Sequence, residues 1–125
     1  MDTVLRVILL AVIGGALAQA SGCKQPGGDL AADFQSEDPH CRVAAIRQAG
    51  ETKDPQSLPY LVDRLTDSEQ EVRFFAILAL ERVTGTTMGY EYYGPSGERA
   101  EAVQRWRQWL RDGRVASRQE AKDQQ

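Results

Sequence analysis

Two cysteines and one histidine are the residues of this sequence best suited to covalent or metal chemistry. A thiol can act as a nucleophile, pair with another thiol or bind a metal. The single histidine, His40, has no cluster of further histidines or cysteines around it, so the sequence contains no recognisable set of metal ligands. The acidic residues are scattered, and neither a glycine-rich phosphate loop nor a nucleophile motif is present. We therefore expect no enzyme activity, no cofactor and no metal.

The residues before Cys23 indicate what happens to its thiol. Residues 6–18 place one positive charge ahead of an apolar run that has signal-peptide length, whereas a spanning helix needs roughly 20 apolar residues. Residues 20–23 (Ala-Ser-Gly-Cys) resemble the bacterial lipobox, although an alanine stands where leucine is usual. The resemblance implies a cleaved signal over residues 1–22 and a diacylated Cys23 as the new N-terminus. Residues 18–20 (Ala-Gln-Ala) also satisfy the small-x-small rule for ordinary secretion, which would release a soluble protein instead.

The surroundings of Cys23 also predict a location. Lys24 stands where lipoproteins retained in the inner membrane carry aspartate, so the resemblance implies the outer membrane, facing the periplasm. A soluble periplasmic or secreted protein is the alternative. If Cys23 carries a lipid, Cys41 has no partner and no disulfide can form. We then expect Cys41 to be a small apolar residue of the core.

The tyrosines form a candidate binding loop. Segment 85–110 (GTTMGYEYYGPSGERAEAVQRWRQWL) holds three of the four tyrosines and both tryptophans. Tyr90, Tyr92 and Tyr93 lie between glycines, a pattern that predicts a loop. Arg99 follows in the first turn of a predicted helix, where the helix dipole disfavours a cation. We expect Arg99 to stack on a tyrosine or to pair with an acidic side chain. The sequence leaves open whether the tyrosines bind a partner or only pack.

The two tryptophans belong to a predicted helix over residues 97–111. Its apolar face carries Trp106 and Trp109, and most of its arginines point elsewhere. We expect this helix to dock both tryptophans on the apolar stretch 74–80 (FFAILAL) and to cap the open end of the domain. The net charge of −3, which removal of residues 1–22 leaves unchanged, argues against nucleic acid as a partner.

The elements that position these residues form a repeat. Segment 36–46 matches segment 67–77 when the chain is shifted by 31 residues, the separation of Arg42 and Arg73. The same shift places Cys41 on Val72. A period of this length is typical of stacked-repeat architectures. Each copy is predicted to be a pair of helices, because turn residues separate two stretches of helical apolar spacing.

A set of positions recurs in the helix pairs over about residues 29–85: Asp54-Pro55, Leu58-Pro59, Leu61, Leu65-x-Asp67, Val72-Arg73, Ala76 and Ala79-Leu80, with Asp38-Pro39, Arg42 and Ala45 one copy earlier. At these positions the chain resembles a HEAT repeat, in particular the short bacterial type related to bilin-lyase repeats. The resemblance implies that Arg42 and Arg73 make structural hydrogen bonds within the array. It also implies an interaction scaffold, because arrays of this family are generic binding surfaces.

The sequence therefore predicts an all-α fold, a short α-solenoid of about two HEAT-like helix pairs plus a C-terminal capping helix over residues 29–112. Residues 23–28 form the lipidated N-terminus and linker, and residues 113–125 form a disordered polar tail. The predicted function is that of a non-catalytic, lipid-anchored module of the bacterial cell envelope that binds an unidentified protein partner. The alternatives are an accessory or chaperone-like factor for an enzyme, as in bilin-lyase relatives, and a soluble secreted scaffold.

Overall fold

The computed structural model of this chain describes residue 23 and residues 29–124, with only the backbone described over residues 115–121. The predicted signal peptide and most of the predicted linker lie outside the described residues. Regular structure in residues 29–124 is entirely helical. The elements are α2 (Leu30–Phe34), α3 (Pro39–Thr52), the 3-10 turn η1 (Pro55–Ser57), α4 (Leu58–Arg64), α5 (Gln70–Thr84) and α6 (Ser96–Asp123). None of the described helices is both long and apolar enough to cross a bilayer.

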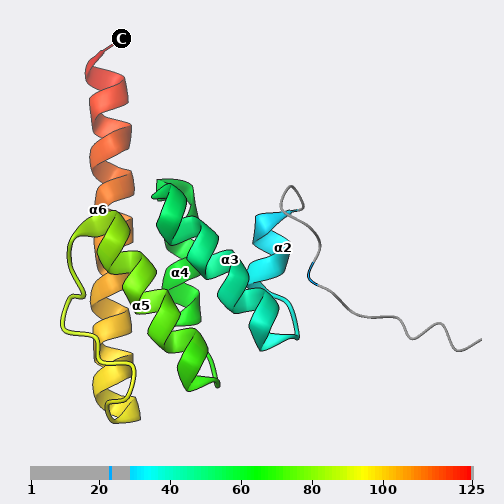
Figure 1. Ribbon diagram of the computed structural model, residues 1–125. Helices are drawn as coiled ribbons and strands as arrows, with labels where there is room; N and C mark the ends of the chain where they lie inside the picture. The colour runs from blue at the N-terminus through cyan, green and yellow to red at the C-terminus, as the bar shows by residue number, and fades with distance from the viewer. Residues whose placement is uncertain (1–22, 24–28, 125) are drawn as a thin grey trace, which may run out of the picture.

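The helices stack as layers along one direction, as Figure 1 shows. Helices α2 and α3 form the first layer, and α4 and α5 form the second. The principal contacts join α3 to α5, α4 to α5 and α2 to α3. Helix α6 follows a loop over residues 85–95 and continues past the ends of the other helices in Figure 1. The predicted all-α solenoid is confirmed.

The same local signal starts several helices. The side chains of Asp29, Asp38 and Asp54 each accept a hydrogen bond from the backbone N–H two residues later. These bonds satisfy donors that a helix start leaves without a partner. In α3 and in η1 a proline occupies the first turn, where no backbone donor is lost. Helix α5 ends at Gly85, which has a φ of 81° that glycine adopts without strain.

Helix α6 repeats the register of the second helices α3 and α5. Counted from the first residue of each helix, the fourth position is arginine: Arg42, Arg73 and Arg99. Three further positions are buried in all three helices. The seventh position is Ala45, Ala76 or Ala102, the eighth is Ile46, Ile77 or Val103, and the eleventh is Ala49, Leu80 or Trp106. Helix α6 therefore carries the sequence register of a second helix and follows a loop over residues 85–95, although its main helix contact is with α4 and not with α5.

This third copy corrects the interpretation of Arg99. The expected period of 31 residues shortens to 26 between Arg73 and Arg99, because a loop needs fewer residues here than a helix. Arg99 is an inward-turned repeat arginine, and its Nη1 donates to the carbonyl oxygen of Gly94. The structure gives it a backbone partner where we expected a tyrosine ring or an acidic side chain.

The end of α6 also differs from the prediction. The helix continues through Gly113 to Asp123, where the sequence had indicated a disordered tail after residue 112. A glycine inside a helix costs only about 1 kcal/mol relative to alanine. Most residues that follow it, such as arginine, alanine, glutamine and lysine, favour helix. The low hydrophobicity of this segment therefore did not exclude a helical backbone.

Candidate interaction site

Arg42 and Arg73 hold the turns before their helices in the same way. Arg42 Nη1 donates to the carbonyl oxygens of Ser36 and Glu37, at 2.7 and 3.1 Å. Arg73 Nη1 donates to the carbonyl oxygens of Asp67 and Ser68, at 2.8 and 2.9 Å. Both side chains are buried. These arginines are occupied inside the fold, and neither is available to a ligand.

The two arginines differ in what else they contact. Arg42 reaches into the next layer, where Nη2 donates to Asp67 Oδ1 at 3.0 Å and Nε lies 2.9 Å from Oδ2. The Nε–H does not point at that oxygen, so this second contact is an ion pair without an aligned hydrogen bond. Arg64 Nη1 adds a further contact to Asp67 Oδ2 at 3.2 Å. Among the described residues Arg73 has no acidic partner of this kind, and its Nε donates to the carbonyl oxygen of Tyr92 at 3.2 Å.

Tyr90 packs into the core and is not part of an exposed binding loop. Its side chain is only 4% exposed, and its hydroxyl donates to the carbonyl oxygen of Leu65 at 2.6 Å. Leu65 closes α4, so this carbonyl has no partner within its own helix. Burial raises the pKa of Tyr90 above its usual value, and the charges of Arg73 and Arg99 oppose that rise in part. Tyr90 is a structural residue.

Tyr92 and Tyr93 instead extend a row of aromatic rings that begins on α5. The rings of Phe75, Phe74, Tyr92 and Tyr93 meet edge to face in that order, with centroid separations of 5.3, 4.9 and 5.0 Å. The first three side chains are partly buried, and Tyr93 is 64% exposed. We call these four residues the aromatic row. Two of the three predicted loop tyrosines therefore lie on an accessible surface, together with two phenylalanines of the stretch 74–80 on which we expected the tryptophans to dock.

A groove lies beside the aromatic row, between α3 and α5. It has a volume of about 310 Å³ and is lined by Arg47, Gly50, Glu51, Phe75, Leu78, Ala79 and Arg82. Its floor is narrow because the helices approach closely at Gly50, where a Cβ atom would lie 3.1 Å from Ala79 Cβ. Arg47 and Arg82 are exposed, while Phe75 and Leu78 are partly buried. The groove thus combines apolar walls with two accessible guanidinium groups.

Helix α6 fixes the loop that carries the tyrosines. Trp106 is fully buried, and its Nε1 donates to the carbonyl oxygen of Thr87 at 3.1 Å. Arg105 Nε donates to the carbonyl oxygen of Met88 at 3.0 Å. Together with the Arg99 bond, these contacts hold residues 87–94 on the helix. The loop backbone is therefore held in a fixed position, and Trp106 is one of the buried side chains that hold it. The docking of Trp106 on residues 74–80 stays a prediction.

Trp109 does not seal the core as predicted. It is 40% exposed and contacts Trp106 edge to face, with ring centroids 5.8 Å apart. Trp109 lies three residues after Trp106, a rotation of about 300° around an α-helix, which carries it to the margin of the buried face. There it borders an open groove of about 470 Å³ lined by Pro55, Leu58, Pro59, Leu110, Gly113 and Arg114.

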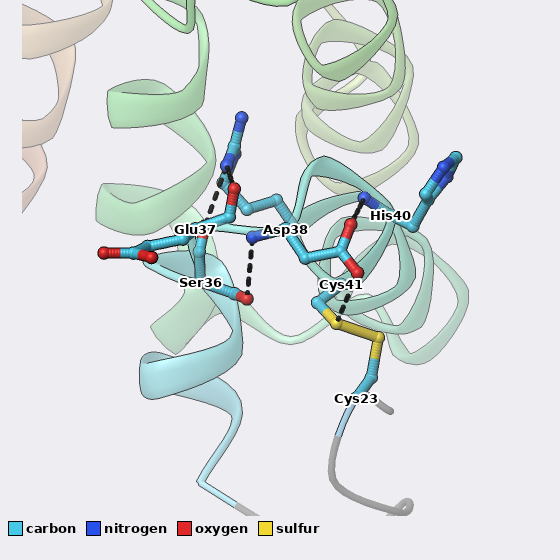
Figure 2. The surroundings of a disulfide bond; sticks show 7 residues. Cys23, Ser36, Glu37, Asp38, His40 and Cys41 are labelled. Atoms are coloured by element: carbon cyan, nitrogen blue, oxygen red, sulfur yellow. Dashed lines mark hydrogen bonds between the residues drawn. A yellow bond between two sulfur atoms is a disulfide. The ribbon is translucent and has the colours of Figure 1, made fainter. Parts of the chain in front are cut away.

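Cys23 and Cys41 are joined by a disulfide, as Figure 2 shows. We expected a free Cys41 on the condition that Cys23 carries a lipid, and the structure differs from that expectation. Cys41 is buried as predicted, with 4% exposure, whereas Cys23 is exposed. Asp38 Oδ1 caps α3 through the His40 N–H at 2.9 Å. The His40 ring points away from the disulfide in Figure 2.

Asp38 also affects the chemistry of the disulfide. Its Oδ2 lies 3.7 Å from Cys41 Sγ, a contact rather than a hydrogen bond while the sulfur is oxidised and has no hydrogen. Negative charge on that sulfur would meet the carboxylate at a cost of up to about 4 kcal/mol at an effective dielectric constant of about 20. The positive end of the α3 dipole would stabilise the same negative charge by only about 0.3–1 kcal/mol. The ligand atoms of Cys23, Asp38 and Cys41 lie within 4.8 Å of one another, but a disulfide offers no thiolate to a metal.

The layered helix pairs and their repeated arginines define a short α-solenoid. The family model of HEAT repeats matches residues 29–121, and this chain belongs to that family. The match extends over α6, in agreement with the third copy of the repeat register. Neither a curated protein nor a solved structure matches the chain. HEAT repeats generally act as non-catalytic scaffolds that mediate interactions between proteins.

Proposed function

We propose that this chain is a non-catalytic module that binds a protein partner through the aromatic row and the adjacent α3–α5 groove. The observation that carries the proposal is the aromatic row itself. Its rings lie on a rigid helix and on a loop that α6 holds in place, and they are only partly covered. Partly exposed aromatic side chains on a rigid surface lose little conformational entropy on binding, and they are enriched at protein interfaces.

The groove specifies the chemistry of the partner. Phe75 and Leu78 form an apolar wall that suits an aliphatic or aromatic side chain. Arg47 and Arg82 provide positive charge at the same place, and Glu51 balances only Arg47, at 4.0 Å. A segment with one apolar anchor and a neighbouring carboxylate therefore fits this surface best. Because the surface belongs to a short array, we expect modest affinity.

We further propose that the module acts in the bacterial cell envelope and is anchored by a lipid on Cys23, most simply in the outer membrane. The support is the apolar run over residues 6–18 and the lipobox-like residues 20–23. The disulfide is compatible with export, because disulfides persist in oxidising compartments. A soluble secreted scaffold is the alternative. A role as accessory factor for an enzyme finds less support, because Tyr90 is turned inward and the three tyrosines do not line one surface.

A comparison of three exported variants tests the binding face. We expect Tyr93→Ala and Arg82→Glu each to lose a crosslinked envelope partner that the wild-type protein retains. Trp109→Ala is the matched control, since Trp109 is also a partly exposed aromatic residue but lies outside the aromatic row. Quantitative mass spectrometry of crosslinked complexes measures the difference. Equal loss in all three variants, or in none, would contradict the assignment of this face.

A further inference from the structure

The Cys23 sulfur has two possible bonds that exclude each other. It is bonded to Cys41 in this structure, and it is also the atom to which the lipobox resemblance attaches a lipid. We propose that Cys41 competes with the lipid for Cys23, so that lipidation yields an anchored form, whereas oxidation, together with hydrolysis of the peptide bond after Ala20 by an ordinary signal peptidase, yields a released form. This inference rests on the proposed lipid anchor.

The two reactions begin from the same thiol. In lipidation, the Cys23 sulfur attacks the glyceryl carbon of a phospholipid, a C–S bond forms, and the phosphorylated headgroup leaves with the thiol proton. In oxidation, one cysteine attacks the disulfide of an envelope thiol oxidase, and the second cysteine then displaces the oxidase from the mixed disulfide. The oxidase takes up two electrons and two protons as a dithiol. Cys41 lies only 18 positions after Cys23, a short separation that favours their encounter during export.

The site protects the disulfide once it has formed. Direct attack on the Cys41 sulfur is hindered, because that residue is buried. Attack on the exposed Cys23 sulfur must expel a Cys41 thiolate, whose charge would lie next to the Asp38 carboxylate at 3.7 Å. Exchange is slower when the leaving sulfur is a poor thiolate. Since thiols do not cleave a thioether, neither form converts readily into the other.

The repeat itself indicates that Cys41 is not needed for packing. The equivalent position in the second layer is Val72, which is fully buried. An apolar side chain of that size is therefore acceptable at this place in the repeat. In the anchored form the reduced Cys41 would remain buried and could donate its S–H to Asp38 Oδ2. The cysteine is thus best explained by its pairing with Cys23.

The test uses the full chain in an exporting bacterial host, with and without the envelope thiol oxidase. Membrane and soluble fractions are separated, and the intact mass of each is measured for the wild type, Cys41→Val and Cys23→Ser. In the Cys41→Val variant, we expect the fraction of the protein that is disulfide-bonded in the wild type to appear in the membrane instead, with the added mass of the lipid. Loss of the oxidase should have the same effect on the wild type and no effect on Cys41→Val. Cys23→Ser should be released in every case.

Two outcomes would overturn the proposal, and they are distinguishable. If the wild type is wholly lipidated and loss of the oxidase changes nothing, the anchor stands and the competition is wrong. If no lipid mass is found even in Cys41→Val, the anchor itself is wrong. The oxidase comparison on the wild type keeps the test decisive if Cys41→Val folds poorly.

Discussion

Arg42 and Arg73 occupy one repeat position, yet the junctions they make with the following layer are different. Both donate to the carbonyl oxygens five and six residues before them. Arg42 then binds a carboxylate of the second layer, Asp67, whereas Arg73 binds only a backbone oxygen of the loop, at Tyr92. The loop therefore replaces the acid of a regular repeat by a neutral acceptor. The junction after the first layer therefore contains an ion pair, whereas the junction after the second layer contains a hydrogen bond to a backbone carbonyl oxygen.

The third arginine continues this trend. Arg99 retains a bond to the carbonyl oxygen five residues before it, in the loop that precedes its helix. The loop in turn is fixed by Trp106 and Arg105 of the same helix. Loop and helix thus form a unit that closes the array without a further pair of helices.

The largest expected effect comes from replacing the repeat arginines by methionine, which has similar length and no charge. Arg42→Met leaves the buried Asp67 carboxylate with one partner fewer, so we expect the free energy of unfolding to fall by about 3–5 kcal/mol. Arg73→Met leaves only backbone carbonyl oxygens without a donor, so we expect the free energy of unfolding to fall by about 1–3 kcal/mol. Urea unfolding of both variants measures the difference. Equal losses would show that the two junctions are energetically alike.

Removal of the disulfide should destabilise the first layer more than helix α6. We expect Cys23→Ser to cost about 3 kcal/mol, because a cross-link over a loop of this size restricts the unfolded chain. Urea unfolding of the disulfide-bonded wild type and of Cys23→Ser should give free energies of unfolding that differ by this amount. Hydrogen exchange should become faster in α2 before it does in α6. A dithiol reductant should not affect the variant, and faster exchange throughout the chain would contradict a local clamp.

Tyr90→Phe tests the contact between the loop and the end of α4 without changing shape. We expect a loss of about 1–2 kcal/mol, since the carbonyl oxygen of Leu65 loses its buried donor. The raised pKa of Tyr90 adds a pH dependence. The unfolded state releases this proton near the ordinary value of 10.0 and the folded state does so at higher pH, so wild-type stability falls as pH rises above that value. Tyr90→Phe should show a shallower fall in thermal melts between neutral and alkaline pH.

The smallest effect on stability is expected for Tyr93→Ala. Its ring is mostly exposed, and substitutions at such positions change stability by about 0.5 kcal/mol or less. A melting temperature close to that of the wild type, together with loss of the partner, would separate binding from folding within one loop. A marked fall in melting temperature would instead mean that the aromatic row supports the packing of the loop.

The sequence predicted the first two layers because their apolar positions and arginines recur at one spacing. It did not reveal the third copy, since the change from 31 to 26 residues removes Arg99 from alignment with Arg73. A search for arginine followed three and four residues later by alanine and a branched aliphatic residue would have found it, as at Arg99, Ala102 and Val103. The burial of Tyr90 and the only partial burial of Phe74 were not predictable in this way. They depend on contacts between α5 and a loop that has no periodicity of its own.

The close approach at Gly50 has a consequence for the shape of the whole array. A methyl group there would lie 3.1 Å from Ala79 Cβ, so the second layer would have to shift by a few tenths of an ångström. In a solenoid, small rotations between neighbouring layers add up to the overall curvature. The missing side chain at Gly50 therefore contributes to the angle between the first two layers. A change from glycine to alanine is expected to alter that angle.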